Sequence, residues 1–467
     1  MRKLLLDAGF QPNTEFHVLD FGYLHGLVPE FLHRFFPRSR FTILDHPDSP
    51  NFRNAEYLSV IRQRDYLKLI SLGSQTALAD KWGLQGGGAW LWRLKDRIDR
   101  KFMAKFGDYP VMPLADLPEP AIPDLVAALA EQPLCGGCGA KVGPSDLAHS
   151  LASLPRPRRA DVIAGAGDDA AQLRFGEDEV QVITTDHLRA FTCDPRLMAT
   201  IAAVHALGDI WAMGAAPQAV LSQITLPRLS AALQSRMLAE ILSAAAEVFT
   251  AAGADIVGGH TSVGSELTIG FTITGLTEWP IVKAGAKPGD VIVLTKALGS
   301  GTVMAAEMRM AHVPGVMLGE SVAAAFASMT RPQTDASALL TPQAHAMTDV
   351  TGFGLAGHLM EVLLASGCAA TLTLSQIPTL PGAVELAAAG HASTIAPANR
   401  AALLGRVTGQ PGRQTPLLYD PQTGGGLLAM VPADKAEALL KTLRKTDPES
   451  AIIGTITHGT PHITIKP

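Results

Sequence analysis

Cysteine, charge and aromatic side chains are all scarce in this chain of 467 residues. It holds only 4 cysteines, too few for a disulfide-stapled secreted scaffold, which favours a reducing, cytoplasmic setting. No run of roughly eighteen uninterrupted apolar residues occurs, so no transmembrane helix is predicted. Asp7 follows a stretch of just three leucines, which is too short for the apolar region of a signal peptide.

An excess of positive charge is also missing, which bears on the expected partners. The formal net charge is −5 at pH 7, so nothing in the charge balance predicts a nucleic-acid partner. Apolar residues make up 47% of the chain, a fraction typical of a soluble globular enzyme. A single core is not expected at this length, and the chain is predicted to divide into several domains.

Two common nucleotide-binding motifs are absent from the sequence. The pattern G-x-x-x-x-G-K-[ST] occurs nowhere, which excludes a P-loop enzyme. No G-x-G-x-x-G follows a predicted strand in the first part of the chain, so dinucleotide-dependent hydride transfer is not predicted. Any nucleotide chemistry must therefore use a different scaffold.

Residues 1–55 are predicted to form one βαβ-like unit. An apolar run, a turn with glycine, an amphipathic helix and a second strand ending in Asp45 follow one another. The unit resembles the opening of a nucleotide-dependent methyltransferase, whose loop is matched by Asp20, Gly22 and Gly26. Leu24 replaces the middle glycine, and the later strands of such a domain are missing. We interpret the unit as a remnant or docking element, with a working cofactor site as the alternative.

Residues 56–110 have a different character. Two strands around a Gly turn are predicted first, and then a helix with an apolar residue at every fourth position, at Trp90, Leu94, Ile98, Phe102 and Phe106. Basic residues flank this stripe, so residues 90–106 either lie on a membrane surface or pack on a neighbouring domain. The segment resembles the C-terminal tail of the flavin-dependent type II NADH dehydrogenases. Residues 111–133 are rich in proline and are predicted to form a linker.

From residue 134 onward the composition is that of one continuous α+β enzyme. Strand-like stretches such as VQVITTD, AVLSQITL and LTIGFTITGL alternate with helical windows around 196–213 and 230–252. A second half of mixed strands and helices begins after KAGAKPGDVIVLTKALGSG. We therefore divide this part into an N-terminal half with the cysteine loop, residues 134–285, and a C-terminal half, residues 286–467.

Four aspartate sites lie beside small residues at turns, at strand ends or within an apolar helix. They are GAGDDAA with Asp168 and Asp169, VITTDHL with Asp186, ALGDIW with Asp209, and MTDVTGFG with Asp349. Taken singly, each is explained by a helix cap or an Asx turn. Taken together, they suit Mg²⁺, which proteins hold through carboxylates and substrate phosphates. The glycines of IVGGHTS would let backbone N–H groups approach a phosphate, at Gly258, Gly259 and His260.

The order and spacing of eight short motifs resemble those of the selenophosphate synthetase family, the selenide, water dikinases. The motifs are GCGAK, GAGDDAA, TTDH, ALGDIWAMGAAP, GGHT, LTKALGSG, TDVTGFGLAGHLMEV and DPQTGGGLL. The resemblance implies the α+β, two-half fold of the aminoimidazole ribonucleotide synthetase-like superfamily, preceded here by a truncated N-terminal α/β fragment. Strands of the N-terminal half would form a barrel at a homodimer interface, and the C-terminal half would be an α/β sandwich. ATP would bind between the halves.

The same resemblance implies the activity and the residues that perform it. ATP, selenide and water would give selenophosphate, AMP and phosphate. Asp169, Asp209 and Asp349 match the family's magnesium ligands, and Cys138 and Lys141 match its catalytic cysteine and lysine. The positions that match nucleotide contacts are Lys141, Ala166, Gly167, Asp168, Asp186, Asp209, Gly258, Gly259 and His260. Two alternatives stay open: another ATP-dependent superfamily member, such as a small-molecule kinase or ligase, and a non-catalytic selenium-binding or docking fusion.

The loop LCGGCGAKVGPSDL, residues 134–147, leaves three interpretations. A zinc clip needs four ligands where CGGC offers two, and a redox pair would follow a strand and open a helix. A mobile nucleophile fits the glycines, which let the loop close over a site and open again. Cys138 would then handle soft selenium, while Lys141 would lower the pKa of Cys138 and stabilise phosphoryl charge.

Two positions depart from the family's pattern. Ala140 stands where many members have a second cysteine, and Cys135 is an additional one. Cys135 is expected either to replace the missing cysteine or to form a resolving disulfide with Cys138. Gly424 stands in place of a serine in DPQTGGG, which we interpret as a minor change.

Overall fold

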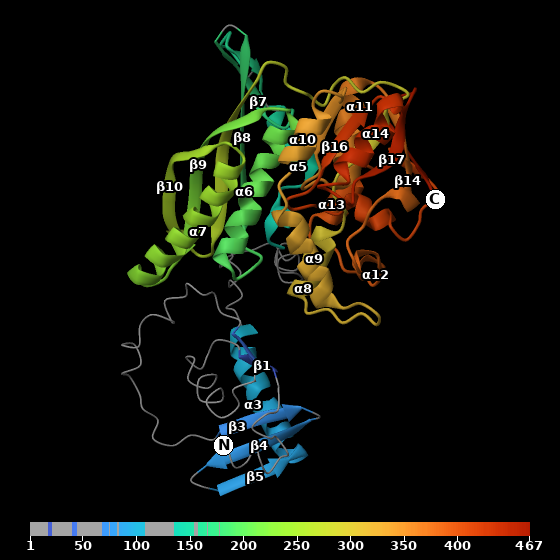
Figure 1. Cartoon of the computed structure of the whole chain (residues 1–467). Coiled ribbons are helices and arrows are strands. Elements are labelled where there is room, and N and C mark those ends of the chain that lie inside the picture. The colour runs from blue at the N-terminus through green and yellow to red at the C-terminus, as the bar shows by residue number, and fades with distance from the viewer. Residues whose placement is uncertain are drawn as a thin grey trace, which may run out of the picture. The chain divides into compact units, whose positions relative to one another are not determined.

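The computed structural model describes residues 17–20, 40–43, 68–73, 75–81, 84–107, 135–153, 157–165, 167–176 and 178–467. The chain divides into two compact units, Met1–Pro113 and Leu114–Pro467, and we describe each by itself (Figure 1). The predicted linker and the predicted glycine loop of the methyltransferase-like unit lie outside the described residues. None of the helices in the described ranges is long and apolar enough to cross a membrane.

The first unit contains two small sheets and a helix. β1 (His17–Asp20) and β2 (Arg40–Ile43) pair in parallel, as expected for a βαβ unit. β3 (Lys68–Gly73), β4 (Thr76–Lys81) and β5 (Leu84–Gly88) form a three-stranded antiparallel sheet, which α3 (Ala89–Gly107) follows. The sequence predicted only two strands before the helix. The third strand, β5, was not predicted, and its glycines disfavour a strand. Pairing with β4 overrides that weak local preference.

The helix α3 confirms the predicted helix, and two residues of its apolar stripe are exposed. Leu91 is buried, and it lies beside Gly86 of the sheet. By contrast, Trp90 is 60% exposed and Ile98 is 46% exposed. Among the described side chains, Leu91 packs on the sheet and lies one position from the stripe, so contact of the stripe with a membrane surface or with a neighbouring domain stays a prediction.

The N-terminal half of the second unit is a six-stranded sheet in the order β10-β9-β11-β8-β7-β6. Its strands are β6 (Val162–Ala164), β7 (Ala171–Phe175), β8 (Glu179–Arg189), β9 (Ala216–Pro227), β10 (Asp255–Gly264) and β11 (Thr268–Thr277). The two predicted helical windows are confirmed as α6 (Pro195–Ala212) and α7 (Ala231–Ala251), which pack on this sheet (Figure 1). α6 begins where it does because the Asp194 side chain accepts the N–H groups of Arg196 and Leu197.

The two faces of this sheet differ in polarity. One face is covered by α6 and buries alternate residues of β11, namely Ile269, Phe271 and Ile273. The other face carries polar side chains that bond across strands: Gln223 donates to Thr272, and Thr272 donates to Thr185, each at 3.0 Å. Leu221 pairs with Thr272 on this face and is 45% exposed. β10 is an edge strand, and most of its residues are exposed.

The C-terminal half is a seven-stranded sheet with helices, in the order β13-β16-β12-β17-β14-β18-β15. Its strands are β12 (Val291–Leu294), β13 (Ala346–Asp349), β14 (Ala369–Thr373), β15 (Val407–Gly409), β16 (Leu427–Val431), β17 (Ala451–Thr457) and β18 (Ile463–Lys466). Its helices are α8 (Ser300–Met308), α9 (Leu318–Thr330), α10 (Thr334–Leu340), α11 (Gly354–Ser366), α12 (Ala383–Ala388), α13 (Ala396–Ala402) and α14 (Ala433–Leu443). β16 is buried throughout, as expected for a central strand covered on both faces.

The helix α6 joins the two halves into one core. It is buried along most of its length, packing on β8 and β11 and also on β13, α9 and α10 of the C-terminal half. Ser337 Oγ of α10 donates a hydrogen bond to the Trp211 carbonyl at 2.7 Å. Polar side chains on α6 are therefore placed where both halves can contribute partners.

Candidate active site

Three aspartates from separate elements converge at the junction of the two halves. Asp169 lies in the turn before β7, Asp209 in the last turn of α6, and Asp349 at the end of β13. One carboxylate oxygen of each lies within 4.8 Å of the other two. These are the three predicted magnesium ligands, which we call the aspartate trio. Gly208 lets α6 come this close, because a Cβ there would be 2.3 Å from Asp349 Oδ2.

The aspartate trio concentrates buried negative charge. Thr184 Oγ1 donates to Asp209, and Thr348 Oγ1 donates to Asp169 at 2.9 Å. Asp169 Oδ2 and Asp349 Oδ1 are buried without a hydrogen-bond partner in the part of the chain that the structure describes. Burial, and then the neighbouring carboxylates, raises the pKa of both Asp209 and Asp349. Orphaned carboxylate oxygens of this kind fit a hard divalent cation.

Lys283 supplies positive charge beside the aspartate trio. Its Nζ lies 2.9 Å from Asp169 Oδ1 and 2.8 Å from Glu361 Oε2. Burial lowers the pKa of Lys283, but the two carboxylates outweigh burial and raise it, so the ammonium stays charged. Sequence analysis missed Lys283, because it lies in the connection before β12 and belongs to none of the motifs. Only the fold brings it to Asp169.

The cysteine loop is held against the C-terminal half of the unit. Its centre is the 3-10 turn η3 (Gly137–Ala140), and α5 (Pro144–Leu151) follows it. Cys138 N–H donates to Thr423 Oγ1 at 3.2 Å. Thr394 Oγ1 accepts from Cys135 N–H at 3.4 Å and donates to the Gly139 carbonyl at 2.9 Å. Two threonines thus bind the loop backbone and leave the side chain of Cys138 free to face α6.

The Cys138 sulfur faces His205 on α6. The distance from Sγ to His205 Nε2 is 3.3 Å, and the same nitrogen lies 3.6 Å from Asp186 Oδ2. Gly424 N–H donates to His205 Nδ1 at 3.3 Å, so the proton of the neutral ring is on Nε2. Burial is the main reason that the pKa of His205 falls to about 4, so the ring is neutral at pH 7.

Sequence analysis also missed His205, although a signal for it was present. His205 precedes Asp209 by four residues on a predicted helix, which places the two side chains on the same side of that helix. A histidine one turn from a candidate metal ligand was therefore a candidate site residue in its own right.

Lys141 connects the cysteine loop to Asp186 of β8. Its Nζ lies 3.3 Å from Asp186 Oδ1. Burial lowers the pKa of Lys141, but the carboxylate of Asp186 and then Cys138 outweigh burial and raise it. For Asp186, burial raises the pKa, while Lys141 and His205 outweigh it and hold that pKa below its usual value. The aliphatic part of Lys141 packs on Gly352, where a Cβ would be 2.6 Å from Lys141 Cδ.

The thiol of Cys138 is protonated at neutral pH. Burial raises its pKa to about 12, while Lys141 acts in the opposite, predicted direction. Lys141 does not overcome burial, because Asp186 and Asp349 also raise the pKa of the thiol. Activation of the thiol therefore needs more than the lysine.

All four cysteines are free, so the alternative of a Cys135–Cys138 disulfide is not realised in this structure. The aspartate trio is the group with metal-ligand geometry in the described ranges, and neither loop cysteine belongs to it.

Two of the predicted nucleotide positions lie beside the aspartate trio. Asp168 Oδ1 accepts from Asp169 N–H at 3.0 Å, and its Oδ2 accepts from Lys283 N–H at 3.4 Å. Gly167 is exposed and has a φ of +139°, a conformation that favours glycine. The third residue of this segment, Ala166, lies outside the described residues.

The predicted nucleotide positions Gly258, Gly259 and His260 lie elsewhere in the sheet. All three are exposed residues of the edge strand β10. Asp186 is on β8, which is three strands away in the order β10-β9-β11-β8. With strands about 4.8 Å apart, this separation is about 14 Å. A single chain therefore does not bring these residues to Asp186.

Family comparisons match both halves of the second unit. The model described as AIR synthase related protein, N-terminal domain, matches residues 167–277. The model for the C-terminal domain of the same family matches residues 287–466. These matches confirm the predicted two-half fold.

Solved structures with the same fold agree with this assignment. The structure of AaThiL complexed with AMPPCP and TMP has a TM-score of 0.52 at 18% identity, covering 69% of this chain and 93% of that one. The structure of a HypE–HypF complex has a TM-score of 0.50 at 18% identity, covering 68% and 95%. At these identities the likeness concerns the fold alone.

Curated relatives are similar over most of their own length. A selenide, water dikinase of Myxococcus xanthus is 36% identical over 349 residues, which are 73% of this chain and 98% of the relative. A selenide, water dikinase of Desulfitobacterium hafniense is 37% identical over 331 residues, 69% of this chain and 94% of the relative. With the cysteine loop and the aspartate trio meeting on α6, the chain belongs to the selenide, water dikinase family.

Proposed function

We propose that this chain makes selenophosphate from ATP, selenide and water and releases AMP and phosphate, with Cys138, Lys141 and the aspartate trio at the reacting centre. The observation that carries the proposal is the ion pair between Lys141 and Asp186 at 3.3 Å. This ion pair connects the cysteine loop to β8, whose Thr184 donates to Asp209. The carboxylate of Asp209 also contributes to raising the pKa of Lys141. The loop's thiol and ammonium are thus coupled to the acidic cluster.

The aspartate trio would hold Mg²⁺ in this proposal. The two buried, unpartnered carboxylate oxygens and the raised pKa values of Asp209 and Asp349 support a cation there. A bound Mg²⁺ would neutralise the triphosphate of ATP. Lys283 pairs with Asp169 at 2.9 Å and opposes the effect of burial, which still raises the pKa of that carboxyl.

Lys141 and His205 would serve the thiol and the phosphoryl group. Lys141 is charged and borders Cys138, so its ammonium is placed to stabilise negative charge on a phosphoryl group in transfer. His205 Nε2–H is directed at Cys138 Sγ, where it stabilises a thiolate more than a thiol. Cys138 would position selenium, since a soft sulfur suits a soft chalcogen better than hard Mg²⁺ does.

A homodimer would complete the nucleotide site. Gly258, Gly259 and His260 match nucleotide positions of the family, yet they lie about 14 Å from Asp186 in the same chain. Their strand forms an exposed edge, and the adjoining polar face with Leu221 is open. We infer that a second copy packs on this face and brings its own β10 to the nucleotide. Sedimentation analysis of a variant with Leu221→Asp should then show a monomer.

Phosphorus NMR of the products tests the proposed function. Incubation of the chain with ATP, Mg²⁺ and selenide under reducing conditions should give a phosphorus signal coupled to selenium, together with AMP and phosphate. Cys138→Ala and Lys141→Ala should both abolish that signal, whereas Cys193→Ala, which removes an exposed thiol outside the site, should keep it. ADP formation that ignores selenide would instead indicate a small-molecule kinase or ligase of the same superfamily. Normal turnover in both loop variants would refute the residue assignment.

For the first unit, the likenesses to a methyltransferase opening and to a type II NADH dehydrogenase tail stay predictions, as does a cytoplasmic location. Contact of α3 with lipid is also a prediction, supported by the exposed Trp90, Ile98, Arg97 and Arg100. Co-sedimentation of the full chain with anionic vesicles tests it. Arg97→Glu with Arg100→Glu should abolish binding if α3 carries it.

A further inference from the structure

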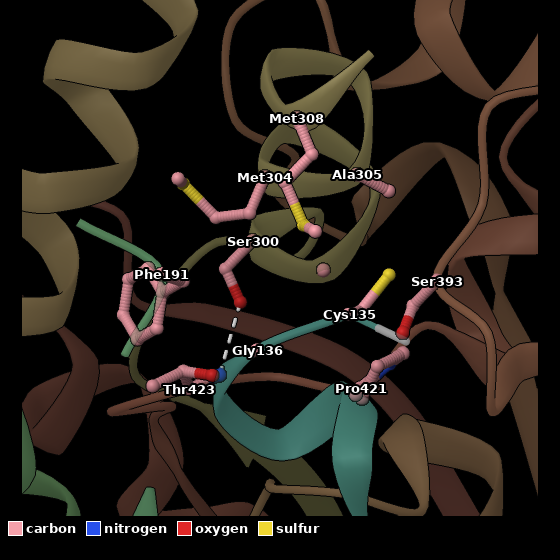
Figure 2. Close-up of a pocket in the computed structure, with 12 residues that line it drawn as sticks. Cys135, Gly136, Phe191, Ser300, Met304, Ala305, Met308, Ser393, Pro421 and Thr423 are labelled. Carbon is pink, nitrogen blue, oxygen red and sulfur yellow. Dashed lines mark hydrogen bonds between the residues drawn. The ribbon is translucent and has the colours of Figure 1, made fainter. Parts of the chain in front are cut away.

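A small pocket lies behind the cysteine loop, between the loop and α8 (Figure 2). The room inside it is small, enough for about one water-sized group. The residues that line it are Cys135, Gly136, Gly139, Phe191, Ser300, Gly301, Met304, Ala305, Met308, Ser393, Pro421 and Thr423. Cys138 is not among them, because its side chain faces α6 instead. The pocket is thus a second space on the loop, distinct from the aspartate trio.

The lining of this pocket is uncharged and rich in sulfur. None of the twelve lining residues carries a formal charge, so multiply charged phosphate groups and Mg²⁺ have no counter-charge there. Three sulfur atoms border the space: the thiol of Cys135 and the thioethers of Met304 and Met308. Figure 2 shows the Cys135 sulfur rising from the loop toward α8, which carries both methionines. Sulfur is polarisable and prefers soft partners to hard ones.

A buried hydroxyl in the wall of the pocket lacks a partner. Ser393 is only 2% exposed, and its Oγ has no hydrogen-bond partner among the described residues. The Ser393 hydroxyl lies close to Gly139 of the loop, where a Cβ would be 2.5 Å from Oγ. Buried hydroxyls are nearly always hydrogen-bonded, so this one indicates a missing acceptor. An acceptor in the pocket would lie between Ser393 and the Cys135 thiol.

We propose that this pocket binds the reduced selenium substrate, as hydroselenide, before it reaches Cys138. The inference rests on the proposed function and adds a binding site for the selenium substrate of that reaction. Hydroselenide is small, soft and singly charged, so it suits a sulfur-lined space with one free hydroxyl donor and one thiol S–H donor. Thr423 lines the pocket and also accepts the Cys138 N–H, so the two spaces share a wall.

The exposed fractions of the lining residues show which end of the pocket is nearer the surface. Met308, the last residue of α8, is 43% exposed, whereas Met304 one turn earlier is 8% exposed. Cys135 is 7% exposed, and Ser393 at the inner wall is 2% exposed. The space therefore runs from the surface toward the back of the loop. Hydroselenide would then enter past Met308 of α8.

Steady-state kinetics with sodium selenide under anaerobic conditions tests the pocket. Ser393→Ala removes the free donor, and Cys135→Ser replaces the soft sulfur. Each should raise the KM for selenide by about tenfold, which corresponds to losing one hydrogen bond or soft contact to an ion. The KM for ATP should stay the same. Cys193→Ser makes the same change as Cys135→Ser at an exposed position outside the pocket and should leave both KM values unchanged.

Anomalous diffraction at the selenium edge gives a second measurement that needs no variant. Crystals of the full chain with ordinary methionine, soaked in sodium selenide and a reductant, should show a peak between Cys135 Sγ and Ser393 Oγ. Selenium found only at Cys138, or wild-type KM values for selenide in both pocket variants, would overturn the inference while leaving selenophosphate synthesis intact. A selenium peak in the pocket of a chain that forms no selenophosphate would instead uphold the pocket and refute the proposed function.

Discussion

Replacement of His205 by alanine tests how the buried thiol is activated. His205 Nε2 lies 3.3 Å from Cys138 Sγ, and the Gly424 N–H at Nδ1 fixes the ring so that Nε2 is the donor. Cys138 must lose its proton to engage selenium as a thiolate, and burial raises its pKa to about 12. A hydrogen bond to a charged group contributes about 1.5–3 kcal/mol, so the variant should form thiolate about ten- to a hundredfold less readily.

The assay is the pH dependence of kcat/KM for selenide, followed as AMP formation. A thiol that ionises with a high pKa makes the rate rise with pH, and loss of the donor raises that pKa further. The His205→Ala curve should therefore lie about ten- to a hundredfold below that of the wild type and be displaced to higher pH. His205→Asn keeps a donor and an acceptor on a shorter side chain and should recover part of the loss.

Two results would refute this reasoning. An equal loss of rate in His205→Asn would mean that His205 only supports the fold of the site, since a shorter side chain that still donates to the sulfur should recover part of the thiolate. Unchanged rates in His205→Ala would mean that the Nε2–H bond is directed at Asp186, which lies 3.6 Å away, and not at the sulfur.

The remaining predictions concern the metal site and the core. Gly208→Ala places a Cβ against Asp349 and should weaken Mg²⁺ binding by about tenfold, measured as the Mg²⁺ dependence of turnover. The control Gly319→Ala should not weaken it, because nothing lies within 4 Å of a Cβ at that position. Metal-free protein should lose thermal stability as pH rises from the ordinary carboxyl value of 3.8 through the raised pKa of Asp209, because the folded state holds the extra proton. Asp209→Asn should remove part of this dependence, and an unchanged melting profile would contradict the assignment. Lys296 Nζ donates hydrogen bonds to three backbone carbonyls at 2.7–2.8 Å, and Lys296→Met removes all three. The variant should lower the free energy of unfolding, measured in urea, by about 3 kcal/mol. A change below about 1 kcal/mol would contradict it.

The parts of the site that sequence analysis predicted are those carried by local motifs. Asp209 and Asp349 lie within short segments whose small neighbours already suggested close packing, and the structure places both beside Asp169. Gly208 shows why the pattern was informative, since only glycine leaves room for Asp349 at that point of α6. The predicted helical window around Asp209 and the predicted strand that ends at Asp186 also agree with α6 and β8.

The parts that were missed depend on contacts between distant segments. Lys283 meets Asp169 across more than a hundred positions of sequence, and nothing near Lys283 marks it as a site residue. The separation of His260 from Asp186 follows from the strand order of the sheet, which a motif does not encode. β5 formed against its glycine-rich sequence because β4 offered it hydrogen-bond partners. In each case the deciding interaction is tertiary.

The cysteine loop shows how a correct local inference can have a different outcome in the folded chain. Lys141 does lower the pKa of Cys138, as its place in the sequence predicted, but its ammonium is also paired with Asp186. An ion pair that is already made leaves less positive charge for the thiol, and burial then keeps the proton on sulfur. A nucleotide phosphate that also pairs with Lys141 would leave still less of its charge for the thiol and would add negative charge beside it. Activation of Cys138 therefore depends on the hydrogen bond from His205 more than on Lys141.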